Sequence, residues 1–154
     1  MENKKEWKRE ISAGGVVYKK QADKIFVLLI KPSGATNNKE KQWTFPKGLL
    51  DGQVPETAAL REVKEEGGVI ANIIEKLGSI KYSYKWEGEN IFKIVTFYLM
   101  EYVSGDPKDH DHEVAEAKWV EIVEVENMLT YPGDKETFEK ALVSLRGSVR
   151  QRRT

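Results

Sequence analysis

Three glutamates within one short helical segment constrain this chain more than any other feature of its sequence. They lie in residues 43–69, WTFPKGLLDGQVPETAALREVKEEGGV, where a proline and a pair of glycines delimit a predicted helix, residues 55–66. At about 100° per residue, Glu62, Glu65 and Glu66 fall within a sector of roughly 100° on that helix. Like charges at these spacings repel each other by about 0.2–0.5 kcal/mol per pair. The cluster therefore needs an explanation.

Two interpretations fit the cluster when it is taken alone. Three glutamates on a helix are most often a solvated face, next to an apolar face that Ala59, Leu60 and Val63 would bury. Alternatively the carboxylates are offered to a cation, and ligands that are all oxygen favour a hard ion such as Mg²⁺ or Mn²⁺. Because the spacing of the glutamates does not decide between the two, the rest of the chain has to.

Composition narrows the class of protein. The 154 residues are 40% hydrophobic and 32% charged with a formal net charge of zero, typical of a globular domain without a global attraction for nucleic acid. There is no cysteine, which excludes disulfides and thiolate chemistry and fits a reducing cytoplasm. No apolar run approaches the roughly 20 residues that span a bilayer, and the N-terminus lacks the apolar core of a signal peptide. We expect one cytoplasmic domain, residues 1–154, with frayed ends at 1–9 and 148–154 and no membrane partner. The composition leaves monomer and homodimer open.

Strand patterns stand on both sides of the predicted helix. Runs rich in β-branched and aromatic residues predict strands, and these are residues 11–19, 25–31, 43–48, 73–86, 91–103 and 117–122. Residues 123–129 predict a short helix, and Asp134 is expected to cap a final amphipathic helix. This order predicts an α+β or α/β fold in which helices flank a mixed β-sheet.

The order of these elements, together with the glutamate motif, resembles the Nudix (MutT-like) hydrolase family. The second half of that family's signature is Arg-Glu, an apolar residue, any residue, Glu-Glu, any residue, Gly and an apolar residue. Residues 61–69, REVKEEGGV, complete it. The first half departs, because Gly48 stands thirteen residues before Arg61 instead of fourteen and Gln53 occupies the position of the loop glutamate. The resemblance implies a Nudix-type α/β/α sandwich.

The resemblance also implies a hydrolase that cleaves a phosphoanhydride bond in a nucleotide with the help of a divalent metal. It implies Glu65 and Glu66 as the principal ligands of Mg²⁺ or Mn²⁺, Glu62 as a further ligand and the Gly48 carbonyl as one more donor. Metal ions held there bridge phosphates and lower the pKa of bound water, which makes these glutamates catalytic. Arg61 is either an ordinary surface arginine or the ion-pair partner that orients the carboxylates, and the motif favours orientation.

Members of this family often take one more acid from a loop outside the signature, as a base or a metal ligand. Glu113, at the end of the polar loop 104–113, is the residue expected to do so here, with Glu116 as the fallback. Because the amide of Gln53 cannot act as a base, this loop is where the fourth carboxylate is expected.

Segments outside the motif resemble the diadenosine tetraphosphate hydrolases of bacteria, in particular SAGGVVY, WTFPKG, KYSYKWEGENIFK and YPGDKETFEKAL. The resemblance implies that lysines meet the phosphate chain as point charges, and the candidates are Lys47 next to Gly48 and, on the hairpin, Lys81, Lys85 and Lys93. It likewise implies that Tyr82, Tyr84 and Tyr131 offer rings on which an adenine could stack. The competing interpretation is that alternating aromatic residues on a strand pack against another layer of the fold, as they usually do.

Several functions share this chemistry and differ in the substrate. They are hydrolysis of ADP-ribose or another nucleotide sugar, of an ordinary or oxidised nucleoside triphosphate, of a diphosphoinositol polyphosphate, or of the 5′ end of an RNA. The zero net charge argues against the last two, whose substrates favour a basic surface. A nucleotide-binding module without catalysis is the alternative from another class, because Gln53 stands where a carboxylate is expected.

Overall fold

The computed structural model describes residues 7–33 and 42–153. Its elements are, in chain order, β1 (Trp7–Gln21), β2 (Lys24–Pro32), β3 (Lys47–Leu49), α1 (Pro55–Gly67), β4 (Val69–Trp86), β5 (Glu89–Gly105), the 3₁₀ turn η2 (Pro107–Asp109), β6 (Val114–Glu121), α2 (Ile122–Met128) and α3 (Pro132–Arg153). The sequence predicts the strand before α1 least well. Trp43 and Thr44 form single bridges, and β3 begins only after Pro46, which has no N–H to donate to a sheet.

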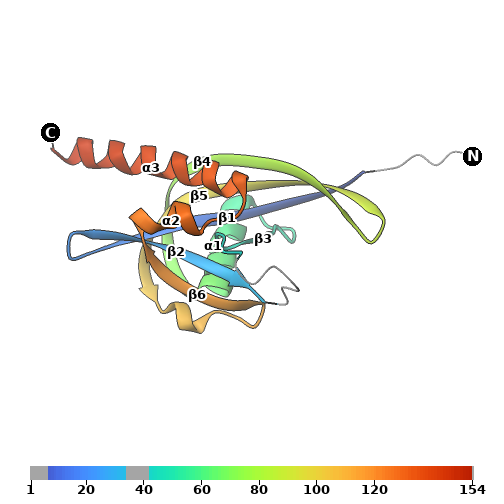
Figure 1. Ribbon diagram of the computed structural model, residues 1–154, viewed down its shortest axis with the longest axis horizontal. Helices are drawn as coiled ribbons and strands as arrows, with labels where there is room; N and C mark the ends of the chain where they lie inside the picture. The colour runs from blue at the N-terminus through green and yellow to red at the C-terminus, as the bar shows by residue number, and fades with distance from the viewer. Residues whose placement is uncertain (1–6, 34–41, 154) are drawn as a thin grey trace, which may run out of the picture.

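One mixed sheet forms the middle layer of the molecule. Its strands lie in the order β4-β5-β1-β2-β6, and β3 pairs with β1 beside that path. β1 and β5 run parallel, whereas the other pairs are antiparallel. Tight turns join β1 to β2 and β4 to β5, and the paired turn residues Ala22-Asp23 and Glu87-Gly88 have the positive φ angles that type I′ turns require. Figure 1 shows the β4–β5 hairpin and the start of β1, which pairs with it, extending beyond the other strands.

Helices cover both faces of this sheet. On one face α1 buries Val63 in a cluster with Val17 and Met100. On the other face, helices α2 and α3, which Figure 1 shows close together, contribute side chains such as Phe138 to a cluster with Phe97. The predicted α/β/α sandwich with a mixed sheet is therefore confirmed. Among the helices of the described residues, none is long and apolar enough to cross a membrane.

Helix α1 begins and ends where the sequence predicts. Pro55 occupies its first turn, and Gly68 ends it in the left-handed conformation, φ 75°, with its N–H bonded to the Lys64 carbonyl. The faces of the helix differ from the prediction, however. Leu60 is exposed, whereas Glu62 is buried beside the apolar residues. The glutamates therefore do not form one solvated face.

Regular structure comes closer to both chain ends than predicted. Residues 7–9 belong to β1 because they pair with residues 90–92 of β5, and α3 continues to Arg153. The expected frayed ends, 1–9 and 148–154, are therefore too long; residues 1–6 and 154 lie outside the described residues. The predicted cap is also wrong, because α3 starts at Pro132 and Asp134 lies inside its first turn.

Candidate active site

Glu62 is the buried member of the glutamate cluster. Its residue surface is 7% exposed, and its carboxyl group lies against β3, where a Cβ added to Gly48 would come within 2.2 Å of Glu62 Cδ. Glycine at position 48 therefore leaves the room that the Glu62 carboxyl group occupies. Burial raises the pKa of Glu62, and the neighbouring Arg61 guanidinium opposes that rise.

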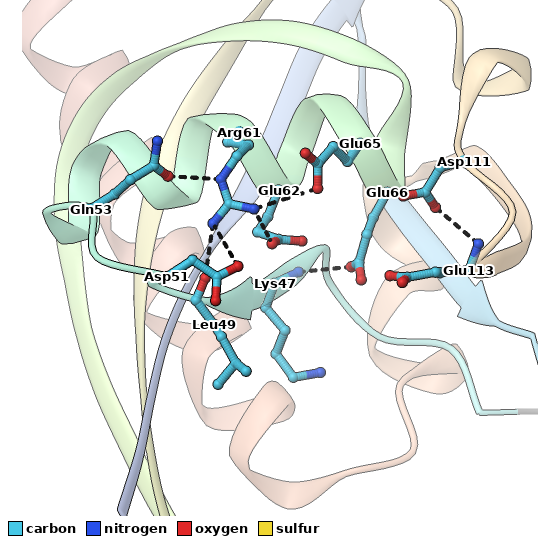
Figure 2. Close-up of polar contacts among 10 residues, drawn as sticks. All are labelled: Lys47, Leu49, Asp51, Gln53, Arg61, Glu62, Glu65, Glu66, Asp111 and Glu113. Atoms are coloured by element: carbon cyan, nitrogen blue, oxygen red, sulfur yellow. Dashed lines mark hydrogen bonds and ion pairs between the residues drawn. The ribbon is translucent and has the colours of Figure 1, made fainter.

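Arg61 connects the glutamates of α1 to the loop in front of the helix (Figure 2). Its Nη1 donates to Glu62 Oε2 at 2.9 Å and to Glu65 Oε1 at 3.5 Å, so one guanidinium bridges two carboxylates. Its Nη2 donates to the Leu49 carbonyl at 2.9 Å and lies 3.9 Å from Asp51 Oδ2. The contact expected between Arg61 and Glu65 is present, and the guanidinium is engaged by protein atoms on several sides.

Gln53, which stands where the family signature has a glutamate, completes this arrangement. Arg61 Nε donates to Gln53 Oε1 at 2.7 Å. That contact requires an acceptor oxygen, and an amide carbonyl supplies one just as a carboxylate does. The shortened loop therefore still anchors the arginine, although the amide cannot serve as a base.

Glu66 lies on the opposite side of the cluster, against the start of β3. Its Oε1 accepts a hydrogen bond of 3.0 Å from the backbone N–H of Lys47. Burial is the largest cause that raises the pKa of Glu66 to about 7, and the carboxylates of Glu62 and Asp111 add to the rise. A buried carboxyl group beside like charges favours either a proton or a cation.

The polar loop before β6 brings further acids to the C-terminal end of α1. The Asp111 N–H donates to the Glu65 carbonyl at 2.8 Å, which fastens the loop to the helix. Asp111 Oδ1 in turn accepts from the Glu113 N–H at 3.0 Å. Figure 2 shows Glu113 on the loop that faces α1, and its charge contributes to the raised pKa of Glu62. The structure thus brings Glu113 to the glutamates of α1.

Asp111 is a member of this group that the sequence does not single out. The run DHDHE, residues 109–113, offers three acids, and nothing in its order tells which of them turns toward α1. Glu116, the fallback candidate, lies on β6 opposite Lys31 and is exposed.

The acids at this site suit a divalent cation by their chemistry. Within the described residues they do not already converge as a group of three ligands. Their donors are all carboxylate oxygens, which hard ions prefer, and burial together with the nearby carboxylates raises the pKa of Glu66. Glu62, Glu65, Glu66 and Glu113 are therefore the residues that could hold Mg²⁺ or Mn²⁺.

A cleft of about 930 Å³ adjoins this site on the face of the sheet that carries α3. Tyr82 and Tyr84 of β4 and Tyr131 before α3 line it, and so does Lys47. Tyr82 and Tyr84 are 40% and 36% exposed, so they are not packed into the core. Lys47 belongs to both places, because its side chain lines the cleft while its backbone N–H binds Glu66.

Lys93 occupies the sheet beside this cleft. It stands between Tyr82 on β4 and Glu10 on β1, and its Nζ lies 3.8 Å from Glu10 Oε1. Tyr84 also donates to Glu10, at 3.0 Å. Burial and the nearby Lys47 ammonium lower the pKa of Lys93. The structure thus brings Lys93 close to Lys47 and places Lys47, Lys81 and the three tyrosines in the lining of the cleft. Lys85 is exposed and does not belong to that lining.

Thr44 and Asp134 are among the polar residues of the cleft that the sequence does not predict as site residues. Thr44 Oγ1 donates to Asp134 Oδ2 at 2.5 Å, and both residues line the cleft. Asp134 is only 2% exposed, and burial raises its pKa. An aspartate two residues after a helix start is a common sequence pattern, so its position gives no sign of a carboxyl group buried in a cleft.

Comparison with known proteins covers the sheet, the helices and the site. The family model described as the NUDIX domain matches residues 8–141. The asymmetrical bis(5′-nucleosyl)-tetraphosphatase of Caenorhabditis elegans is 30% identical over 121 residues, which cover 78% of this chain and 85% of the relative. The crystal structure of a C. elegans Ap4A hydrolase binary complex has a TM-score of 0.71 at 30% identity, covering 90% of this chain and 98% of that chain.

Other matches extend over less of the relative or are more distant in sequence. MutT4 of Mycobacterium tuberculosis is 38% identical over 100 residues, which cover 64% of this chain and 40% of that protein. The chain therefore spans about two fifths of this relative's length. The NUDIX domain of Shewanella oneidensis NrtR, solved with ADP ribose, has a TM-score of 0.69 at 20% identity over 89% of this chain and 88% of that chain, a likeness in fold alone.

Proposed function

The chain belongs to the Nudix hydrolase family, and we propose that it cleaves a phosphoanhydride bond of a nucleotide polyphosphate, with diadenosine tetraphosphate as the favoured substrate and Mg²⁺ or Mn²⁺ as cofactor. The position of Lys47 is the observation on which this proposal depends. It joins an aromatic cleft to the carboxylates of α1, so a nucleotide bound in the cleft would lead its phosphates directly to those carboxylates. The similarity to the C. elegans tetraphosphatase along most of both chains supports the choice of substrate.

The residues of the cleft would bind and orient the substrate. Tyr82, Tyr84 and Tyr131 present rings to a base, while Lys47 and Lys93 place two ammonium groups near each other. Two close cations repel, and a phosphate between them would relieve that repulsion and form charge-assisted hydrogen bonds. Such binding holds the scissile anhydride against α1, which lowers the entropic part of the barrier.

The acids on the other side of Lys47 would carry out the reaction. Glu62, Glu65 and Glu66 would hold the metal, which when bound would neutralise phosphate charge and lower the pKa of water. Glu113 would take the proton of the attacking water, since its side chain is exposed and its charge acts on Glu62. Arg61 keeps Glu62 and Glu65 in register through its two carboxylate contacts.

A product-resolved assay tests this function. The protein is incubated with diadenosine tetraphosphate and Mg²⁺, and the nucleotides are separated over time, with EDTA as the control. We expect release of ATP and AMP that EDTA abolishes and Mg²⁺ or Mn²⁺ restores. Binding of the dinucleotide without release of either product would refute the proposal and favour a nucleotide-binding module. Parallel reactions with ADP-ribose, nucleoside triphosphates and 5′-triphosphate RNA compare the rates at which the protein cleaves the alternative substrates.

A further inference from the structure

The carboxyl group of Asp134 is buried in the wall of the cleft without a cation to pair with. Among the side chains that the structure describes, no lysine or arginine lies within ion-pair distance of it. The Lys47 ammonium is near enough to lower the pKa of Asp134, but burial outweighs that effect. Because burying a carboxyl group costs free energy, its presence at 2% exposure needs a reason.

One possible reason is structural, since Asp134 could serve only to hold two segments of the chain together. That role does not fully explain why the residue is an aspartate. The hydrogen bond from Thr44 to Asp134 does connect the first turn of α3 to the segment before β3. An asparagine would accept the same hydrogen bond without introducing a charge into the cleft. A tether therefore accounts for an acceptor oxygen here, but not for a carboxyl group.

The surroundings of Asp134 indicate a planar ligand that donates hydrogen bonds. Asp134 is among the charges that raise the pKa of both Tyr82 and Tyr131, so the carboxyl group lies near two aromatic rings that line the same cleft. A carboxylate offers about four acceptor positions, and Thr44 uses one of them. The cleft, at about 930 Å³, falls in the range of small-molecule sites.

We propose that Asp134 determines base specificity by accepting a hydrogen bond from the exocyclic amino group of a nucleobase held among Tyr82, Tyr84 and Tyr131. Adenine, guanine and cytosine carry such a group, whereas hypoxanthine has an oxo group in place of the amino group of adenine and lacks that of guanine. Thr44 is the positioning residue, because its hydroxyl occupies one oxygen and directs the rest of the carboxyl group. The inference rests on the proposed function insofar as the cleft takes a nucleotide.

Binding of mononucleotides without metal tests this inference separately from hydrolysis. The dissociation constants of AMP, GMP and IMP are measured by titration calorimetry for the wild type and for Asp134→Asn. We expect the wild type to bind AMP or GMP at least about tenfold more tightly than IMP, the size of one charge-assisted hydrogen bond. In Asp134→Asn the amide oxygen keeps the Thr44 contact and an NH₂ group faces the base, so the preference should disappear or reverse.

Glu139→Gln is the matched control. It makes the same change of charge on the same helix, but at an exposed side chain outside the lining of the cleft, so the ratio should stay at its wild-type value. Equal affinities of the wild type for the three nucleotides, no measurable binding of any of them, or an unchanged ratio in Asp134→Asn would overturn the inference. Cleavage of diadenosine tetraphosphate without base preference would overturn it and leave the proposed function intact. Base preference without cleavage of any anhydride would refute the function alone.

Discussion

At position 48 the absence of a side chain decides where the Glu62 carboxyl group lies. In Gly48→Ala the added Cβ would fall 2.2 Å from Glu62 Cδ, so the carboxyl group must move. We expect kcat to fall by about 100-fold, as displacements near 1 Å cost in other active sites, while the protein still folds. Gly147→Ala is the control, because its Cβ meets nothing within 4 Å, and its kcat should equal that of the wild type. Equal kcat in both variants would contradict the placement of Glu62 in the site.

Removal of the single carboxylate charge of Glu66 tests the proposed metal site. We expect Glu66→Gln to lower kcat by at least about 100-fold, because an amide is a weaker ligand for a hard cation than a carboxylate. The fold should survive, since the substitution removes a buried charge while keeping the side-chain shape. Steady-state kinetics over a range of Mg²⁺ concentrations and thermal unfolding check both statements. Glu56→Gln changes an exposed glutamate at the other end of α1 and should leave kcat unaltered; a loss there as large as in Glu66→Gln would point to an effect of helix charge instead.

Substitutions of Gln53 test whether this position requires only a hydrogen-bond acceptor for Arg61 or specifically an amide. Because Gln53 Oε1 accepts from Arg61 Nε at 2.7 Å, Gln53→Glu keeps the contact and makes it charge-assisted. We expect kcat equal to or above the wild-type value in Gln53→Glu and a loss of about tenfold in Gln53→Ala, in which Arg61 loses this anchor. Single-turnover rates for the three proteins measure the difference. If kcat falls in Gln53→Glu as far as it does in Gln53→Ala, the position requires the amide itself and an acceptor oxygen is not enough.

At the scale of elements, the first turn of α3 contains the buried carboxyl group of Asp134, and its titration should make the stability of the protein depend on pH. Burial raises the pKa of Asp134 above its ordinary 3.8, so between 3.8 and the raised value the folded chain binds more protons than the unfolded chain. Wild-type stability therefore falls as pH rises through this window. Asp134→Asn lacks that loss, and its unfolding temperature relative to wild type should increase from pH 4 to pH 7. Thermal unfolding across this range measures it, with the exposed Glu136→Gln as control; a difference that does not vary with pH would contradict the burial of a titrating carboxyl group.

Elements whose signals are local in the sequence were the predictable ones. The proline start and glycine end of α1 depend on neighbouring residues, and they lie where the sequence predicts them. The turns of the two hairpins fall in the gaps between the predicted strands. Burial of Glu62 is not local, because it depends on β3 passing over the helix with a glycine at the contact. A helical wheel cannot contain that information, so it assigned Glu62 to the same face as Glu65.

The same distinction separates the predicted site residues from those that were missed. Glu113 follows from a family pattern in the sequence, whereas Asp111 is defined by its hydrogen bond to the Glu65 carbonyl, across a loop. Asp134 looks like a helix cap, and only its contact with Thr44, 90 positions away, places it in the cleft. Chemistry that one segment carries can be read from the sequence, while chemistry that two distant segments make together requires the fold.

At the scale of the whole molecule, the sheet brings a group of carboxylates close to a pair of ammonium groups. Each group consists of like charges, and each lowers the stability of the folded protein when no ligand is bound. Carboxylates of α1 crowd on one side of β3, and Lys47 and Lys93 approach each other on the other side. Burial of Lys93 lowers its pKa, so its ammonium form is disfavoured in the folded protein and reduces stability at neutral pH. A protein under selection for stability alone would have an uncharged side chain at this position, and the phosphate of the proposed substrate would account for the lysine.

Lys93→Met separates these two contributions, because methionine keeps a similar length and removes the charge. We expect the unfolding temperature without ligand to rise and KM for diadenosine tetraphosphate to increase by about tenfold, the loss of one charge-assisted hydrogen bond. Inorganic tripolyphosphate should stabilise the wild type more than Lys93→Met, since ligand binding to the folded state adds to stability. Lys85→Met changes an exposed lysine near the tip of the same hairpin that does not line the cleft, so it should alter neither quantity. If Lys93→Met instead unfolds at a lower temperature and keeps the wild-type KM, the lysine serves the fold through its contact with Glu10, and the phosphates must bind elsewhere in the cleft.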